Sequence, residues 1–137
     1  MYLIDTDILI DFFKGKYKLN EKIKSVGLQN CFVSEITIAE ITYGALKSSD
    51  VAKELENVHR VRANFKILSI SEALALYSQE RLRLEREGAR IPDFDLLIGA
   101  TSVVHRLIMM TGNAKHFSRI KGVIIENWRL KEYNEFL

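Results

Sequence analysis

Five short apolar runs, each of three or four residues, are spread along the chain and separated by stretches in which apolar residues recur at helical spacing. Such runs are typical of strands buried on both faces of a parallel sheet, and the helices between them supply the crossover connections that parallel strands need. The pattern therefore predicts an α/β fold with a mostly parallel, five-stranded central sheet. The predicted strands are Tyr2–Ile4, Cys31–Val33, Ile67–Ile70, Leu107–Met110 and Val123–Ile125.

The stretches between these runs carry apolar residues every three or four positions and are expected to form helices. Two helices are expected between the second and third strands and two more between the third and fourth. The connections are therefore not a simple alternation, and the strand order stays open. The predicted helices are Ile8–Phe13, a basic piece ending at Gly27, Ile38–Lys47, about Asp50–Phe65, Glu72–Glu87 and Asp95–Val104.

Length and composition predict one globular domain over residues 1–137, since 137 residues with 47% hydrophobic side chains can bury one core. A net charge of +2 argues only weakly for a polyanionic partner. The single cysteine, Cys31, excludes an internal disulfide framework and is expected to be a small buried residue. The N-terminal run is interrupted by Asp5 and Asp7 and lacks a basic leader, so we expect no signal peptide, no membrane span and a cytoplasmic location.

Polar side chains follow the predicted strands at the points where the strands end. Asp5 directly follows the first strand, and Asn113 comes just past the fourth. Glu40 is expected in the first turn of the helix after the second strand, and Asp95 at the start of the helix that leads to the fourth. Because functional sites of parallel α/β sheets lie at the carboxyl ends of the strands, these groups are expected to meet at one edge.

Gathering acids in this way is unfavourable without a counter-charge. Two carboxylates about 4 Å apart repel each other by roughly 4 kcal/mol at an effective dielectric near 20. Bound protons or a cation must offset this repulsion, and a donor set made only of oxygen atoms suits Mg²⁺ or Mn²⁺. A hard divalent cation held by acids activates water and stabilises charge on a phosphodiester, so the pattern favours a nuclease.

Each of these residues also has a purely structural interpretation. Asp5 can cap the helix that follows it, and Glu40 can close a capping box with Thr37. An acid such as Asp95 is favoured at a helix N-terminus by the helix dipole, whatever the function. Asn113 can simply occupy a turn. Taken one at a time, the residues do not decide between the two interpretations.

The sequence predicts different environments for Asp11 and for the three lysines that follow it. Asp11 is expected on the solvated side of its helix. The three lysines Lys14, Lys16 and Lys18 lie close behind Asp5 in the sequence and are favoured for contact with phosphate groups.

The histidines and the arginine-rich segment predict structural roles. His59, His105 and His116 lack the spacing of metal ligands and are expected to be structural. The arginines between positions 81 and 90 alternate with glutamates, which favours a solvated helix face over an RNA-binding surface. Trp128 is expected to close the core rather than to stack on a base.

Four segments in a fixed order resemble the PIN-domain ribonucleases, specifically the VapC-type toxins of bacterial type II toxin–antitoxin pairs. The resemblance covers nearly the whole chain. The segments are MYLIDTDILIDFFKG at the start, VSEITIAEITYGA near residue 40, IPDFDLLIGATS near residue 95 and TGNAKHFSRIKGVIIENW at the end.

This resemblance implies a three-layer, PIN-like sandwich and assigns roles to individual positions. Asp5 and Asp95 would be the metal-binding acids, with Glu40 as the acid of the second motif. The motif acid directly precedes the run Leu-Leu-Ile-Gly-Ala, which selects Asp95 over Asp93. The supporting positions implied by the resemblance are Thr6, Asp7 and Thr111.

One position departs from the commonest pattern. Many PIN domains place a fourth acid where this chain has Asn113, although an amide also occurs there among these toxins. We therefore expect one well-held Mg²⁺ or Mn²⁺ ion, with Asn113 as an outer ligand, and leave a second ion open. The resemblance also implies single-stranded RNA (tRNA or mRNA) as the substrate, a homodimer, and a cognate antitoxin as partner.

Two other functions are compatible with parts of the sequence. An Asp-x-Asp pair after a strand, here Asp5 and Asp7, also begins the haloacid-dehalogenase phosphatases, but Leu9 stands where that family has Thr or Val. A PIN-like module that binds RNA or protein without cutting is the second alternative. It would have no use for costly convergent negative charge.

Overall fold

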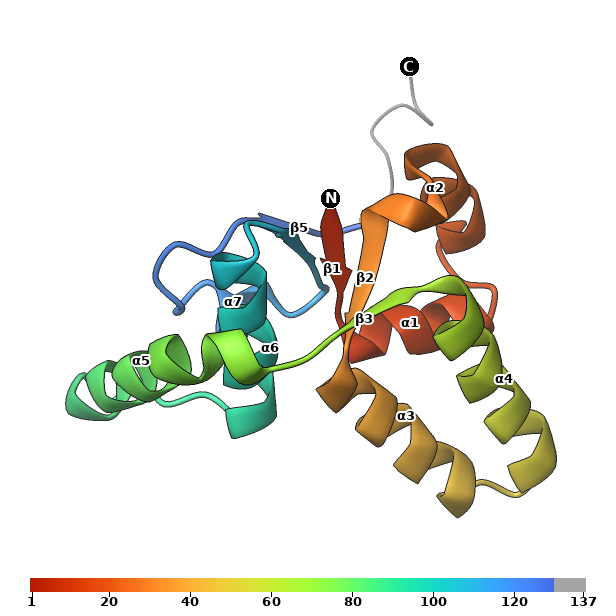
Figure 1. Cartoon of the computed structure of the whole chain (residues 1–137), viewed down its shortest axis with the longest axis horizontal. Helices are drawn as coiled ribbons and strands as arrows, with labels where there is room; N and C mark the ends of the chain where they lie inside the picture. The colour runs from red at the N-terminus through yellow and green to blue at the C-terminus, as the bar shows by residue number, and fades with distance from the viewer. Residues whose placement is uncertain (130–137) are drawn as a thin grey trace.

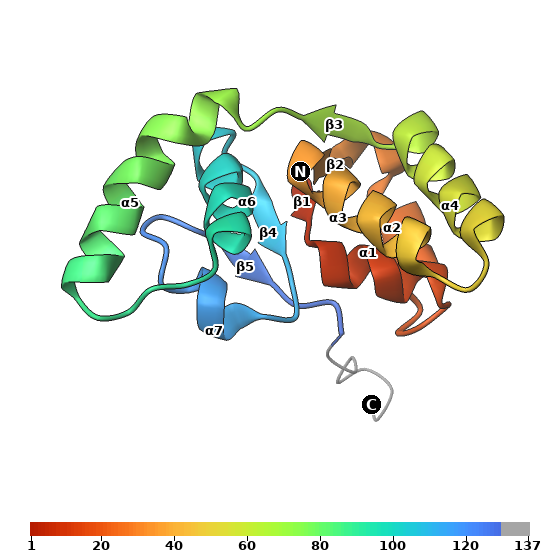
Figure 2. The ribbon, with the colours of Figure 1, turned by 90° about the horizontal axis from the view of Figure 1, so that it is seen from below.

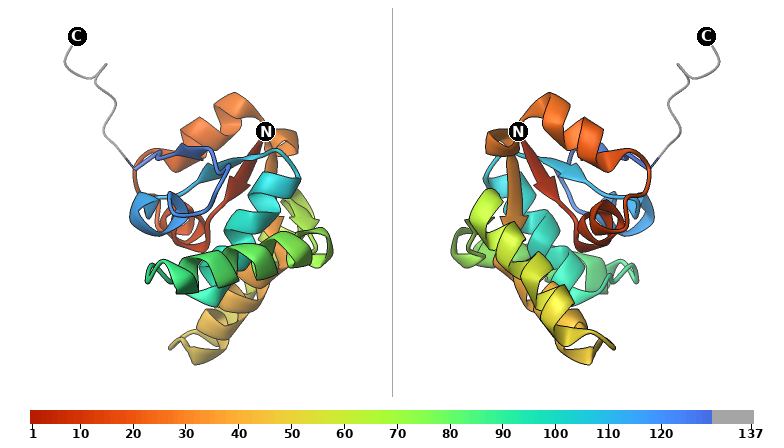
Figure 3. Two further views of the ribbon diagram at one scale, coloured as in Figure 1. Left: turned by 90° about the vertical axis from the view of Figure 1, so that its left-hand side faces the viewer. Right: turned by 90° about the vertical axis from the view of Figure 1, so that its right-hand side faces the viewer.

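The central sheet is parallel throughout, with the strand order β3-β2-β1-β4-β5. The computed structural model describes residues 1–129. The strands lie between layers of helices, as Figures 1 and 3 show, so the predicted three-layer α/β architecture is confirmed. The strands are β1 (Tyr2–Ile4), β2 (Cys31–Ser34), β3 (Lys66–Leu68), β4 (Ile108–Met110) and β5 (Ile125–Glu126).

The helices occupy the predicted stretches, with two after β2 and two after β3. The 3₁₀ turns are η1 (Leu28–Asn30) and η2 (Ser71–Ala73). The α-helices are α1 (Thr6–Phe13), α2 (Leu19–Val26), α3 (Glu35–Lys47), α4 (Val51–Asn64), α5 (Leu74–Arg86), α6 (Asp93–Val104) and α7 (Ala114–Phe117). Short α7 was not predicted, and β3 and β5 are displaced from their predicted positions by one or two residues at each end.

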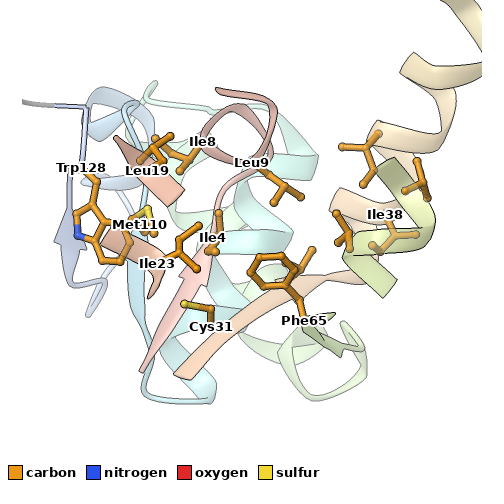
Figure 4. Packing of buried hydrophobic residues seen from close by; sticks show 14 of the residues in the cluster. Ile4, Ile8, Leu9, Leu19, Ile23, Cys31, Ile38, Phe65, Met110 and Trp128 are labelled. Atoms are coloured by element: carbon orange, nitrogen blue, oxygen red, sulfur yellow. The ribbon is translucent and has the colours of Figure 1, made fainter. Parts of the chain in front are cut away.

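The two faces of the sheet take alternate residues of its central strands into two buried clusters. Leu3 and Met109 belong to one buried cluster, with Leu96 and Phe117, whereas Ile4 lies in the other. This period of two follows from the pleat of a strand and explains why the central strands β1 and β4 are apolar at every position. Figure 4 shows the second cluster, in which Cys31 and Trp128 are buried as predicted.

The sheet reverses its order of strand addition between β1 and β4. From β1 the chain first builds outward through β2 and β3, and it then returns to add β4 and β5 on the other side. In Figure 2, α1 and α3 lie on one side of these central strands and α6 and α7 on the other. A crevice at the carboxyl ends of the strands is expected at such a switch point, and Asp5 and Thr111 are the residues that follow β1 and β4.

The start of α3 differs from the prediction. The helix begins at Glu35, and its cap is Ser34, whose Oγ accepts a hydrogen bond of 3.1 Å from the backbone N–H of Ile36. Glu40 therefore lies in the second turn and cannot form a capping box with Thr37 at the helix end. The sequence-based prediction starts this helix at Ile38 and gives the cap to Thr37, whereas Ser34, directly after the predicted strand, is the N-cap and starts the helix three residues earlier.

No helix in the described part of the chain is long and apolar enough to cross a membrane.

Candidate active site

Asp5 lies at the junction of β1 and α1 and is 5% exposed. It is the N-cap of α1, with Oδ1 accepting a hydrogen bond of 2.8 Å from the backbone N–H of Thr6. Its other oxygen, Oδ2, accepts a 2.8 Å hydrogen bond from the hydroxyl of Thr111. The capping interpretation is thus correct, but it uses one oxygen only. Each carboxylate oxygen has a second lone pair, so both can still bind a cation.

Thr6 links α1 to the acid on α3. Its hydroxyl donates a 2.7 Å hydrogen bond to Oε1 of Glu40 and lies 2.9 Å from the hydroxyl of Thr37. Since the only hydroxyl proton of Thr6 goes to Glu40, Thr37 is the donor in the second contact. Thr37 is fully buried, so this chain of hydroxyls holds the Glu40 carboxylate against α1.

Asp95 lies in the first turn of α6 and contacts the segment that follows β4. Its Oδ2 is 2.9 Å from Nδ1 of His116, and the same ring nitrogen is 2.9 Å from the side-chain amide of Asn113. The backbone N–H of Asn113 donates a 2.9 Å hydrogen bond to the hydroxyl of Thr111. The contacts of Asp95 and those of Asp5 therefore converge on the short segment from Thr111 to His116.

The acids of the site act on one another through their charges. Burial raises the pKa of Asp5 from 3.8 to about 6, and the charges of Asp7 and Asp95 add to this rise, while the hydrogen bond from Thr111 opposes it. Burial also raises the pKa of Glu40, again with contributions from Asp95 and Asp7, against the hydrogen bond from Thr6. Residues from α1, α3 and α6 thus share one region of negative potential.

The carboxylates are not closed around a common point. Within residues 1–129, no three Asp, Glu, His or Cys side chains are already arranged to hold a metal ion. Glu40 is instead held by Thr6, and Asp95 by His116. The chemistry of the site nevertheless fits a hard cation, because its donors are carboxylate and amide oxygens and because two of its acids have pKa values raised by desolvation and like charge.

Asp93 lies in the same helical turn as Asp95 but contacts a different helix. Its Oδ1 accepts a 3.1 Å hydrogen bond from the hydroxyl of Tyr77 on α5, and its carboxylate lies 3.5 to 3.7 Å from the guanidinium groups of Arg90 and Arg81. These neutralising partners separate Asp93 from the group of acids around Asp5.

A groove of about 510 Å³ opens beside Glu40, between α1, α3 and α4. Its apolar lining includes Ile10 and Val58, and its charged lining includes Lys14 and Lys53. One of the lysines that the sequence favours for phosphate contact therefore lies in the same hollow as a candidate catalytic acid.

Comparison with known proteins decides the family. The family model described as PIN domain matches residues 2–123. Ribonuclease VapC1 of Methanocaldococcus jannaschii is 32% identical over 120 residues, which cover 87% of this chain and 80% of that protein. The chain belongs to the PIN-domain family, in its VapC ribonuclease group. This membership excludes the haloacid-dehalogenase alternative.

Further VapC proteins match over almost their whole length. Ribonuclease VapC2 of Rickettsia felis is 28% identical, covering 93% of this chain and 98% of that protein. The tRNA(fMet)-specific endonuclease VapC of Salmonella typhimurium is 27% identical over 93% of this chain and 97% of that protein. The solved structure of DNA-bound VapBC from Salmonella typhimurium superimposes with a TM-score of 0.83 at 27% identity, covering 93% of this chain and 97% of that one.

The sequence of this PIN domain did not predict that His116 contacts Asp95. The histidine was assigned a structural role because it has no partner at ligand spacing, yet it contacts Asp95, 21 residues away. The available signal was Gly99, one helical turn beyond Asp95. A Cβ at Gly99 would collide with Ile120 and lie 3.1 Å from Phe117, so the missing side chain lets the α7 segment pack against α6.

Two other predictions about charged residues were wrong in this VapC-type chain. Asp11 is 8% exposed rather than solvated, and its Oδ2 accepts a 2.6 Å hydrogen bond from Nε of Arg129. On α5, Glu80 is 4% exposed and accepts two hydrogen bonds from Arg83 and one from the backbone N–H of Lys121. This part of the arginine-rich helix therefore anchors the segment after α7 instead of facing solvent.

Proposed function

We propose that this PIN domain is a Mg²⁺-dependent endoribonuclease that hydrolyses single-stranded RNA and acts as the toxin of a toxin–antitoxin pair. The observation that carries the metal dependence is the buried carboxylate of Asp5, which has a pKa raised to about 6 and lies in the fields of Asp7 and Asp95. A cation offsets that accumulation of negative charge, and Mn²⁺ has the same preference for oxygen donors.

Asp5 and Asp95 are the proposed ligands of the cation, with Asn113 as an outer ligand. The cation, when bound, supplies the positive charge that activates a water and stabilises the phosphodiester during attack. Thr111 and Thr6 orient the Asp5 and Glu40 carboxylates through the hydrogen bonds already described. Glu40 completes the acidic group or positions the attacking water, and burial raises the pKa of its carboxyl group above the ordinary value, against the hydrogen bond from Thr6.

The substrate and the partners are proposed by similarity. The Salmonella typhimurium relative is named for cleavage of tRNA(fMet), which supports a tRNA as the first substrate to test, before mRNA. Similar solved structures are VapBC complexes, including VapBC2 of Rickettsia felis bound to a DNA fragment of the promoter, with a TM-score of 0.79 at 26% identity over 93% of this chain and 98% of that one. These complexes support a cognate antitoxin as partner. A homodimer is proposed from the resemblance to VapC-type toxins alone.

A cleavage assay tests the function. Purified protein should cleave single-stranded RNA in Mg²⁺ or Mn²⁺, lose this activity in excess EDTA, and regain it when the cation is restored. Intact RNA under all conditions would favour the non-catalytic binding module. Cleavage that persists in excess EDTA would exclude the metal role while leaving the nuclease assignment in place.

A further inference from the structure

Arg129 follows β5 and is held by hydrogen bonds to α1 and to its own preceding segment. Its Nε donates a 2.6 Å hydrogen bond to Oδ2 of Asp11, a buried residue of α1. Its backbone N–H donates a 2.9 Å hydrogen bond to Oδ1 of Asn127. The preceding carbonyl, that of Trp128, accepts a 2.8 Å hydrogen bond from Nζ of Lys22 on α2. The backbone and one edge of the guanidinium are therefore both fixed.

The guanidinium lies against the turn that carries Thr111 and Asn113. A Cβ on Gly112 would collide with Nη1 of Arg129 and would lie 2.8 Å from its Cδ, so the absence of a side chain at Gly112 makes room for the arginine. The neighbours of Gly112 on either side, Thr111 and Asn113, are those that contact Asp5 and His116. Arg129 thus lies beside the turn whose residues contact Asp5 and His116, although its own side chain bonds to none of the acids around Asp5.

Among residues 1–129, the two terminal nitrogens of Arg129 have no hydrogen-bond or ion-pair partner. Within the described residues, the hydrogen bonds and ion pairs of its side chain involve Nε only, and the side chain is 29% exposed. The Nη1–Nη2 edge of a guanidinium is a rigid pair of donors that matches two oxygens of a phosphate group. Asp11, by holding Nε, limits the rotation of that edge and reduces the entropy lost when an anion binds.

We propose that Arg129 binds a phosphate of the RNA backbone next to the scissile phosphodiester, with Asp11 as the residue that orients it. This inference rests on the proposed ribonuclease function and adds a subsite to it. The subsite has a physical purpose: Asp5, Asp7, Glu40 and Asp95 repel a polyanion, and a fixed cation at the edge of the site compensates for part of that repulsion.

The first test compares Arg129→Gln and Arg129→Lys with the wild type. Both variants should raise KM for a short single-stranded RNA by about tenfold, the scale of one charge-assisted pair, with kcat within about twofold. Lysine should not rescue binding, because a point charge cannot bond Asp11 and present a two-donor edge at once. Arg86→Gln removes an equal charge from an exposed position near the end of α5 and should leave KM unchanged.

A second test measures binding of fluorescein-labelled RNA by anisotropy over a range of salt concentrations, with Asp95→Asn in every protein so that the RNA stays intact. Loss of one phosphate contact should reduce the slope of log affinity against log salt by about 0.7 in Arg129→Gln. The Arg86→Gln protein should keep the slope of its parent.

Variants of Asp11 separate orientation from overall charge. Asp11→Asn keeps an oxygen acceptor for Nε and should retain RNA affinity. Asp11→Ala removes the acceptor and one negative charge, so charge alone predicts tighter binding, whereas loss of orientation predicts weaker binding by severalfold. Tighter binding by Asp11→Ala would overturn the role of Asp11.

An arginine that only holds the chain after β5 in place would lower the melting temperature in Arg129→Gln and leave KM and the salt slope unchanged, which would overturn the proposal. A wild-type protein that cleaves no RNA would instead contradict the proposed function. The two failures are therefore distinguishable.

Discussion

The hydroxyl of Thr111 donates a 2.8 Å hydrogen bond to Oδ2 of Asp5. This bond joins the ends of β1 and β4, the two strands between which the order of strand addition reverses. The two residues are 106 positions apart in the sequence, but β1 and β4 pair with Ile4 opposite Met110, so the residues that follow are neighbours. The backbone adds a 2.9 Å hydrogen bond from the N–H of Asp5 to the carbonyl of Met110. The register of two buried strands thus positions the central acid of the site.

Thr111→Val should raise the pKa of Asp5 further, because it removes the hydrogen bond that stabilises the charged carboxylate while keeping the side-chain volume. The variant should need more Mg²⁺ for half-maximal RNA cleavage at neutral pH. A magnesium titration of initial rates measures this shift. Cleavage with an unchanged magnesium dependence would show that the Thr111 hydroxyl does not influence the cation site.

The metal-free protein should lose stability as the pH rises from about 4 to about 6. The pKa of Asp5 is about 6 in the folded protein against 3.8 for an unperturbed aspartate, so the folded state binds more protons in this window. Ionising Asp5 in the folded protein should lower the free energy of unfolding by up to about 3 kcal/mol above pH 6. Urea unfolding in EDTA at several pH values measures this contribution.

Asp5→Asn should remove that pH-dependent contribution and abolish cleavage. The amide keeps an acceptor for the backbone N–H of Thr6 but carries no charge, so the metal-free variant should be more stable than the wild type at pH 7. Parallel unfolding curves at pH 4 and pH 7 provide the comparison. A variant that is less stable than the wild type at both pH values would mean that the hydrogen bonds of Asp5 outweigh its electrostatic strain.

Asp95→Asn and Asp93→Asn form a matched pair in one helical turn. Asp95→Asn should abolish cleavage with the fold intact, because it removes a proposed ligand. Asp93→Asn should retain activity within a few-fold, since the Asp93 carboxylate is bound by Tyr77 and neighbouring arginines of the α5 side. Initial rates together with circular dichroism test both variants. Equal losses of activity in the two would contradict the distinction.

Gly99→Ala should destabilise the protein and reduce cleavage. A methyl group there collides with Ile120 and crowds Phe117, at a cost of about 1–3 kcal/mol, and pushes away the segment that carries His116. Gly44→Ala in α3 is the matched control, because nothing lies within 4 Å of its added Cβ and alanine is the better helix former, by up to about 1 kcal/mol. Thermal unfolding of both variants checks the opposite signs.

The sequence predicted the fold class well because the central strands are short and apolar and because helices with periodic apolar residues separate them. It also predicted that Asp5 and Glu40 follow successive strands, which places both at the carboxyl edge of a parallel sheet. The strand order could not be predicted from the sequence, because a connection that contains two helices can lead to several different positions in a sheet. The structure resolves this with β1 at the centre.

The contacts that refine the site were not visible in the sequence, because they depend on tertiary packing. His116 gains its partner only when the α7 segment packs on α6, and Arg129 reaches Asp11 only across the whole fold. Local rules also competed at Ser34, where strand propensity and helix capping use the same residue. The roles of such residues depend on neighbours that they meet only in the folded protein.

Calorimetric titration with Mn²⁺ at pH 7 tests most directly whether Asp5, Glu40 and Asp95 share a cation. The wild-type protein should bind Mn²⁺ with saturation, whereas Asp5→Asn and Asp95→Asn should lose this binding. Undiminished binding in both variants, or no binding by a wild-type protein that cleaves RNA, would contradict the account.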